Sequence, residues 1–222
     1  MNLDEIMSFD AKVLKSNESN CYIYKDMIYK IFNSDIDIKK RLHAIEIFLN
    51  NNIQGCPMVY DFIHDNSKVV GYSMKYYDKA KPFSIDRRFR IRKEICYQLV
   101  NIYLNLKEKY NICYFDFHNG NIFLNDGKVL LLDVDSCLNN TRINAEISEK
   151  FLFEYVLTVI YKTFFFDNEL YFSNNERYLV RSTLYEHDGK KMQNIEELKD
   201  FIQEVSKRDV HKVLKKIPYK IR

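Results

Sequence analysis

The segment from Tyr114 to Ser136 holds the residues whose types and spacing could do chemistry. Asn121 follows Asp116 by five positions, and Asp133 comes near the end of the apolar run VLLLDV. A carboxylate can accept a proton from a hydroxyl group, while an amide oxygen and a second carboxylate are ligands that suit Mg²⁺. These three groups fit phosphoryl transfer from ATP, because that reaction needs an oriented acceptor and cations that neutralise the phosphates.

A tight loop and a hairpin would have to position these three side chains. The short apolar runs IFL and VLLLDV are separated by Asn125-Asp126-Gly127, and Asp-Gly between two such runs is a strong hairpin signal. A loop carrying Asp116 and Asn121 would then lie beside a hairpin strand that ends at Asp133. Ahead of the loop, apolar residues at helical spacing predict a long helix: Ile95, Leu99, Ile102, Tyr103 and Leu106.

The first part of the chain is predicted to be rich in β-structure. Residues 21–32 read as two strands around a Lys25-Asp26 turn, and residues 58–64 and 68–77 read as two more. Between these pairs, residues 36–50 carry apolar side chains at helical spacing and predict one amphipathic helix.

After Pro82 the pattern becomes mainly helical. Residues 151–166 are apolar nearly all round and predict a buried central helix, and further helices are expected near 176–186 and 194–216. The sequence therefore predicts an α+β fold in two lobes. The first, residues 1–77, is β-rich with one helix; the second, residues 78–222, is helical and carries the loop and the hairpin.

The stretch DFHNGN followed by LLDVDS resembles the catalytic loop and metal-binding aspartate of the protein-kinase-like superfamily. The residues of this motif are most similar to those of aminoglycoside and choline kinase-like enzymes and of small atypical bacterial kinases. The resemblance implies that Asp116 is the catalytic base and that Asn121 and Asp133 hold Mg²⁺ beside ATP. It also implies that His118 supports the catalytic loop.

The same resemblance implies a nucleotide site in the first lobe. Lys30, in the predicted strand MIYKIF, would grip the α- and β-phosphates and pair with Glu46 on the following helix. Met74 and Tyr76 fall where the superfamily's hinge passes behind the adenine. These two are assigned by position only, because backbone groups bind adenine there.

Three features depart from the superfamily pattern. The candidate phosphate loop, residues 14–24, contains no glycine, although glycine permits close backbone approach to phosphates. Phe115 stands where many regulated protein kinases have arginine, so a phosphorylated loop would lack its usual charge partner. Asp133-Val134-Asp135 replaces D-F-G and no A-P-E follows, so a conventional activation segment is not expected. Asp135 is either a second metal-facing carboxylate or a hydrogen-bonding turn residue, and we favour the turn residue slightly.

Three functions remain open at this point. The first is an atypical Ser/Thr protein kinase without a conventional activation segment, and the second is a kinase for an aminoglycoside, choline or a similar alcohol. The acceptor is a hydroxyl group in both cases, on a protein or on a small molecule. The third, which the retained motif residues argue against, is a pseudokinase that binds nucleotide and partners.

Composition narrows the partners and the compartment. The net charge is only +3, so the basic residues near the C-terminus read as a solvated helix face in preference to a nucleic-acid docking strip. Five widely spaced cysteines without a C-x-x-C pair favour free thiols. No apolar run approaches the length of a membrane span, and residues 1–10 lack the pattern of a signal peptide. A cytoplasmic protein is therefore expected.

Overall fold

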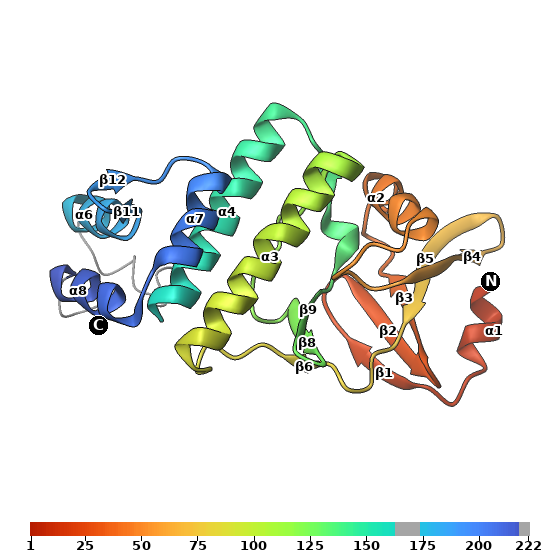
Figure 1. Ribbon diagram of the computed structural model, residues 1–222. Helices are drawn as coiled ribbons and strands as arrows, with labels where there is room; N and C mark the ends of the chain where they lie inside the picture. Colours follow the sequence, from red (N-terminus) through yellow and green to blue (C-terminus); the bar gives the residue numbers. More distant parts are fainter. Residues whose placement is uncertain (163–173, 218–222) are drawn as a thin grey trace.

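The computed structural model describes residues 1–162 and 174–217 and shows a mixed α+β protein. A five-stranded antiparallel sheet forms one end of the molecule and a group of helices forms the other (Figure 1). The strand order in the sheet is β1-β2-β3-β5-β4. Its strands are β1 (Lys12–Lys15), β2 (Ser19–Tyr24), β3 (Met27–Phe32), β4 (Val59–Asp65) and β5 (Lys68–Lys75).

Alternation along β3 gives the sheet two different faces, because successive strand side chains point to opposite sides. Tyr29 and Ile31 belong to a small apolar cluster with helix α1 (Leu3–Met7) on the outer face. Ile28 and Phe32 belong to the main core on the inner face, with helix α2 (Lys39–Asn50). Lys30 lies between them in the strand, so its side chain enters the inner face.

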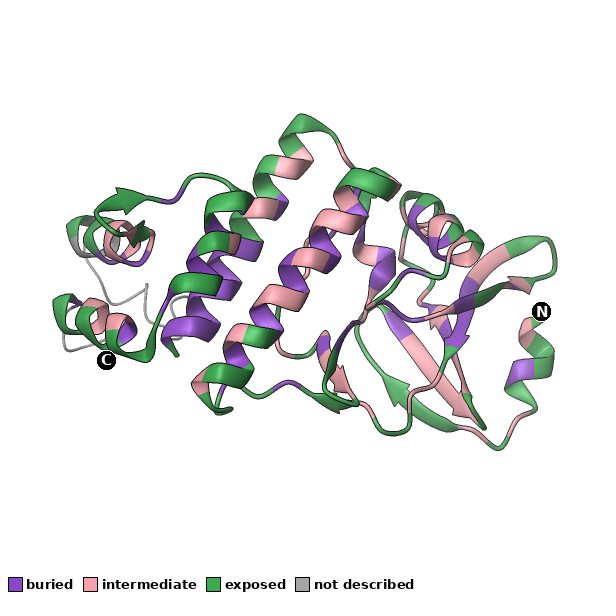
Figure 2. Ribbon diagram, viewed as in Figure 1, coloured by how far each residue is buried: buried purple, intermediate pink, exposed green. Residues whose placement is uncertain are grey.

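The helical part is organised around α3 (Phe89–Tyr110) and α4 (Arg142–Tyr161), which lie side by side (Figure 1). Their facing sides are buried, as Figure 2 shows. The remaining helices pack at the far end: α6 (Asn174–Leu184), α7 (Ile195–Glu204) and α8 (Lys207–Lys216). A short pair, β11 (Glu186–His187) and β12 (Lys190–Lys191), joins α6 to α7.

Small β-elements lie between the sheet and the helices. Strand β6 (Lys81–Pro82) pairs with the hairpin of β8 (Ile122–Asn125) and β9 (Lys128–Leu131). The hairpin turn places both Asp126 and Gly127 at positive φ, as the Asp-Gly signal predicts. Strand β7 (Ile112–Cys113) pairs with β10 (Leu138–Asn139). In the chain, one 3-10 turn, η1 (Val134–Ser136), follows β9 and precedes β10.

Most of the predicted elements are confirmed, with shifted ends. The 36–50 helix begins at Lys39, and the predicted central helix is α4, which begins at Arg142; residues 163–166 of that prediction lie outside the described residues. Strand β1 was not predicted, and the expected 194–216 helix is divided at Val205 and Ser206. The five cysteines are free thiols. Within the described ranges, no helix combines the length and apolar character needed to cross a membrane.

Candidate functional site

Lys30 is the only lysine on the inner face of β3, and it is buried. The register of the sheet places Cys21 of β2 on one side of it and Tyr72 of β5 on the other. Its ammonium group donates to a carboxylate oxygen of Asp133 and, at 2.7 Å, to Oδ1 of Asp135. The sheet is thereby joined to the residues that follow β9.

Asp135 is a carboxylate whose two oxygens both accept hydrogen bonds and whose side chain has no exposed surface. Its Oδ1 accepts from Lys30 and, at 2.7 Å, from the Tyr72 hydroxyl, and its Oδ2 accepts from Nη1 of Arg41 at 2.6 Å. Three donors hold it, as a buried carboxylate requires. Of the two roles considered for Asp135, this environment fits the hydrogen-bonding one.

Asp133 is the more accessible of the two aspartates, with 27% of its side chain exposed. It has a left-handed backbone, φ 57° and ψ 45°, which aspartate tolerates better than most residues. The Asp133 side chain is therefore partly exposed at the site, where a cation that prefers oxygen ligands could reach it.

The charges of these groups shift one another's pKa values. Burial by itself would lower the pKa of Lys30, but the carboxylates of Asp135 and Asp133 outweigh it and raise that pKa. Burial and the negative charge of Asp135 raise the pKa of Asp133. For Asp135 burial acts in the same direction, but the donors Lys30, Tyr72 and Arg41 prevail and lower its pKa.

Asp116 is held by two neighbours within its own loop. One carboxylate oxygen accepts from Nδ2 of Asn121 at 2.7 Å, and the other lies 3.3 Å from Nε2 of His118. Nδ1 of His118 accepts from the backbone N–H of Gly120 at 3.0 Å, so a neutral His118 carries its proton on Nε2 and faces Asp116 with a donor. His118 thus has one hydrogen bond within the loop, at Nδ1, and a close contact with Asp116 at Nε2, which is compatible with the predicted supporting role.

Backbone contacts bring the loop to the end of the hairpin. The Tyr114 hydroxyl lies 3.1 Å from the carbonyl oxygen of Asp116 and 2.9 Å from that of Leu132. The backbone N–H of Leu132 donates to the carbonyl oxygen of Asn121 at 2.8 Å. Because Leu132 precedes Asp133, these contacts bring Asp133 close to the loop that carries Asp116 and Asn121.

The predicted pairing of Lys30 with Glu46 is wrong. Glu46 lies on α2 but faces solvent, and Lys30 pairs with Asp133 and Asp135 instead. The residue that α2 directs to this cluster is Arg41, in its first turn. The helix therefore contributes a positive charge where the resemblance implied a negative one.

The residues predicted at the hinge lie at the end of β5. Met74 is buried in the strand, opposite Ile28 and Val59. Tyr76 follows the strand, and its backbone N–H donates to the carbonyl oxygen of Asp26 at 2.7 Å. That N–H is therefore occupied within the protein.

The glycine-free turn between β1 and β2 is tied to the rest of the sheet. Asn33 donates from Nδ2 to the carbonyl oxygen of Asn17 at 2.8 Å and from its backbone N–H to that of Glu18 at 2.9 Å. No residue of the turn has positive φ, so the turn itself does not need glycine. Glu18 also contacts Nη2 of Arg41 at 2.8 Å.

Sequence reasoning missed Arg41 and Tyr72 and undervalued Asp135. The D-x-D spacing was a signal for Asp135, because a second carboxylate so close to a buried strand end needs partners. Arg41 and Tyr72 carry no such signal, since their roles depend on how α2 and β5 meet Asp135.

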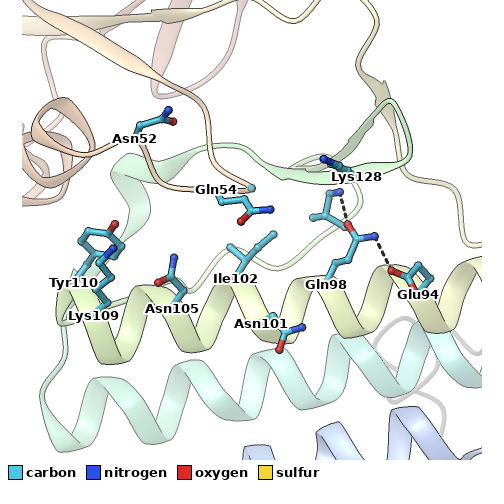
Figure 3. A pocket seen from close by; sticks show the side chains of 12 residues that line it. Asn52, Gln54, Glu94, Gln98, Asn101, Ile102, Asn105, Lys109, Tyr110 and Lys128 are labelled. Carbon is cyan, nitrogen blue, oxygen red and sulfur yellow. Dashed lines mark hydrogen bonds between the residues drawn. The ribbon is translucent and has the colours of Figure 1, made fainter.

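A cavity of about 620 Å³ lies elsewhere, along one side of α3 (Figure 3). Gln98 lines it and is fixed by hydrogen bonds to Glu94 and to the backbone N–H of Val129. The lining is rich in carboxamides: Asn52, Gln54, Gln98, Asn101 and Asn105. None of the predicted site residues lines this cavity, so it is separate from the charged cluster.

One further group of potential metal ligands lies in the helical part. His187, Asp188 and Glu204 place ligand atoms within 4.8 Å of one another, and Nε2 of His187 is 3.1 Å from Oε2 of Glu204. Asp188 and Glu204 are exposed. This group is formed by β11, the turn that follows it and the end of α7, and it is separate from the cluster around Lys30.

No family model matches the chain, and a search of curated proteins finds no relative.

Proposed function

We propose that this protein is an ATP- and magnesium-dependent phosphotransferase with a two-lobed, protein-kinase-like fold. The observation that carries the proposal is the ion pair between Lys30 and Asp133, which joins the inner face of the sheet to the hairpin end beside Asp116 and Asn121. A buried lysine aimed at a partly exposed aspartate is the arrangement expected where phosphates and their cation meet.

The residues of the cluster fit a magnesium ion. Asp133 offers a carboxylate on a partly exposed side chain, and Asn121 offers an amide oxygen, since its Nδ2 is the atom that donates to Asp116. Mg²⁺ prefers such hard oxygen ligands and is bound through one or two carboxylates together with phosphates. The ion would neutralise charge on the β- and γ-phosphates.

In this proposal each residue has one task. Lys30 binds the phosphates, Asp133 and Asn121 hold the cation, and Asp116 orients the acceptor hydroxyl and accepts its proton. Nδ2 of Asn121 donates to one oxygen of the Asp116 carboxylate and Nε2 of His118 contacts the other, and both contacts limit the rotation of this carboxylate. A fixed carboxylate favours one acceptor geometry, which is how positioning lowers a barrier.

The acceptor we favour is a Ser or Thr hydroxyl of a protein. Only Cys137 to Thr141 separate η1 from α4, and this short connection argues for an atypical kinase without a conventional activation segment. The second candidate is a small alcohol. The observation that favours it is His118, which contacts Asp116 and is typical of the small-molecule branch of the resembled superfamily.

The test is transfer of γ-labelled phosphate from magnesium-ATP, offered a generic basic protein in one arm and a panel of amino alcohols and aminoglycosides in the other. The Asp116→Asn variant should lose transfer by about 10²–10⁴-fold, the usual contribution of a general base, while it still binds magnesium-ATP. The matched control is Asp126→Asn, an exposed hairpin-turn aspartate, which should transfer at the wild-type rate.

Each outcome decides between functions. Transfer to protein that depends on Asp116 supports the first acceptor, and transfer to an alcohol supports the second. Nucleotide binding without transfer to any acceptor would favour a pseudokinase. Wild-type protein that binds no magnesium-ATP would refute the proposal.

A further inference from the structure

The guanidinium group of Arg41 contacts two carboxylates from segments far apart in the chain. Nη1 donates to Oδ2 of Asp135 at 2.6 Å, and Nη2 donates to Oε2 of Glu18 at 2.8 Å. The Arg41 side chain is mostly covered, with 19% exposed. One side chain of α2 therefore connects the β1–β2 turn to the end of the hairpin.

The Asp135 contact leads directly to Lys30. Asp135 uses Oδ2 for Arg41 and Oδ1 for Lys30 and Tyr72, so these donors together set the orientation of one buried carboxylate. Without Arg41, Oδ2 would lose the only side-chain donor that the described residues provide for it. The carboxylate could then rotate about its bonds to Lys30 and Tyr72, and one of the two carboxylates that hold the ammonium group of Lys30 would no longer be fixed.

The Glu18 contact leads to the turn that replaces the glycine-rich loop. The Glu18 backbone is tied to Asn33, but its side chain is 54% exposed and its charged partner is Arg41. This contact is weaker than the first, because an exposed ion pair is screened by water. The Glu18–Arg41 contact can still fix the position of the β1–β2 turn relative to the inner face of the sheet.

We infer that Arg41 is a positioning residue for phosphate binding, an inference that rests on the proposed function. Through Asp135 it fixes the ammonium group of Lys30, and through Glu18 it fixes the β1–β2 turn. The pair of Arg41 and Asp135 thus takes the place of a helix glutamate. Arginine suits this task because its planar fork can bind two carboxylates at once, which lysine cannot do in the same geometry.

The experiment measures Lys30 directly. An acyl-phosphate derivative of ATP transfers its acyl group to an amine beside the bound phosphates, and mass spectrometry gives the rate at Lys30 with saturating probe. The dissociation constant of magnesium-ATP and the melting temperature are measured alongside. The variants are Arg41→Ala, Arg41→Lys and Glu18→Gln, with Lys40→Ala as the matched control, because Lys40 is an exposed cation of the same helix turn.

The two contacts predict different results. Arg41→Ala should slow the labelling of Lys30 at saturation by about tenfold or more, since a charge-assisted hydrogen bond is lost. Glu18→Gln should weaken magnesium-ATP binding by at most about fivefold and leave the saturated labelling rate unchanged. Arg41→Lys, which keeps one contact, should restore Lys30 labelling and resemble Glu18→Gln. Lys40→Ala should match wild type.

Two further measurements need no nucleotide and separate this inference from the proposed function. They are acetylation of Lys30 by acetic anhydride and amide hydrogen exchange of the turn around Glu18. If wild type fails to bind magnesium-ATP, faster acetylation and exchange in Arg41→Ala alone would keep the positioning role while the phosphotransferase proposal fails. Wild-type labelling, acetylation and exchange in a folded Arg41→Ala variant would overturn the inference.

Discussion

Asp133 and Asp135 are two residues apart, yet their carboxyl groups lie in opposite environments. Asp135 is enclosed by donors, and its pKa is lowered although burial opposes this. Asp133 is partly exposed, and burial together with the charge of Asp135 raises its pKa. A carboxylate kept where its charge is unfavourable is typical of functional sites, which accept a stability cost for binding.

This contrast predicts that Asp133→Asn is more stable than wild type at pH 7. The folded pKa of Asp133 is raised, so its contribution to stability is full below the unfolded value of about 3.9 and is lost as pH rises. Asparagine removes the charge and tolerates the left-handed backbone of this position. Urea unfolding at several pH values should show a gain at pH 7 that shrinks toward zero near pH 3.

The same variant should no longer bind Mg²⁺ with nucleotide, as isothermal titration would show. Asp126→Asn, also at positive φ but exposed in the hairpin turn, is the control for the backbone. A destabilised Asp133→Asn protein would mean that the Lys30 ion pair outweighs the burial cost. Unchanged magnesium-ATP affinity would remove Asp133 from the cation site.

At the scale of elements, the placement of Lys30 depends on a close approach between β3 and β5. A Cβ atom on Gly71 would lie 2.1 Å from the carbonyl oxygen of Lys30, a distance that only a backbone shift could relieve. Glycine is required there because two backbones meet, not because of its own φ. The position of Lys30 is therefore built into the sheet.

We expect Gly71→Ala to move β3 and with it the ammonium group of Lys30, and to weaken magnesium-ATP binding about tenfold or more. A misplacement of about 1 Å can cost about 10²-fold in the rate of an enzyme reaction, so a loss of this size in the affinity for the phosphates is reasonable. Its free energy of unfolding should fall by about 1–3 kcal/mol, the range for overpacking. Gly127→Ala is the control: φ is +79° and no atom lies within 4 Å of the added Cβ. It should lose about 1–2 kcal/mol through backbone strain alone and keep its nucleotide affinity. Equal nucleotide affinity in both variants would contradict this account of Lys30.

The sequence predicts elements well where one face is buried and poorly where it is not. The alternation in MIYKIF is enough to place Lys30 on an inner face, because Ile28 and Phe32 share its side of the strand. The start of α4 is missed because its first turn buries no side chain: Arg142 and Ile143 are exposed, and the helix is begun by Thr141, whose hydroxyl accepts from the N–H of Asn144 as an N-cap.

The charged cluster could be predicted only in part, for a related reason. The loop and the hairpin encode Asp116, Asn121 and Asp133 at short range, through D-x-x-x-x-N and the Asp-Gly turn. The choice between Glu46 and Arg41 depends on the rotation and start of α2, which the helical period leaves open within one turn. The structure begins α2 at Lys39 and thereby directs Arg41, not Glu46, toward Asp135.

At the scale of the whole molecule, one apolar core extends from the sheet through α3 and α4 to α8. Arg92 of α3 makes buried polar contacts across this core. Its Nη1 donates to the carbonyl oxygens of Val159 at 2.6 Å and Ile160 at 3.0 Å, near the C-terminal end of α4. These carbonyls lack partners within the helix, and the cation faces the negative end of its dipole.

Burial lowers the pKa of Arg92, and its Nε has no partner among the described residues. The cost of burying these groups offsets part of the stability that the two hydrogen bonds to α4 contribute. We expect Arg92→Met to lower the free energy of unfolding by about 1.5–3 kcal/mol, the value of a hydrogen bond to a charged group. Arg90→Met, on the same helix but exposed, should change it by less than about 0.5 kcal/mol. Urea unfolding of the two variants makes the comparison.

Magnesium-ATP affinity should be unchanged in both variants, because the hydrogen bonds that Arg92 makes among the described residues go to α4 and not to the Asp116 loop or Lys30. A stable Arg92→Met protein would mean that the cost of burying the cation cancels its bonds to α4. Lost affinity in a folded Arg92→Met variant would instead mean that the packing of α3 on α4 sets the geometry of the site, since the loop bearing Asp116 follows directly from α3 and β7.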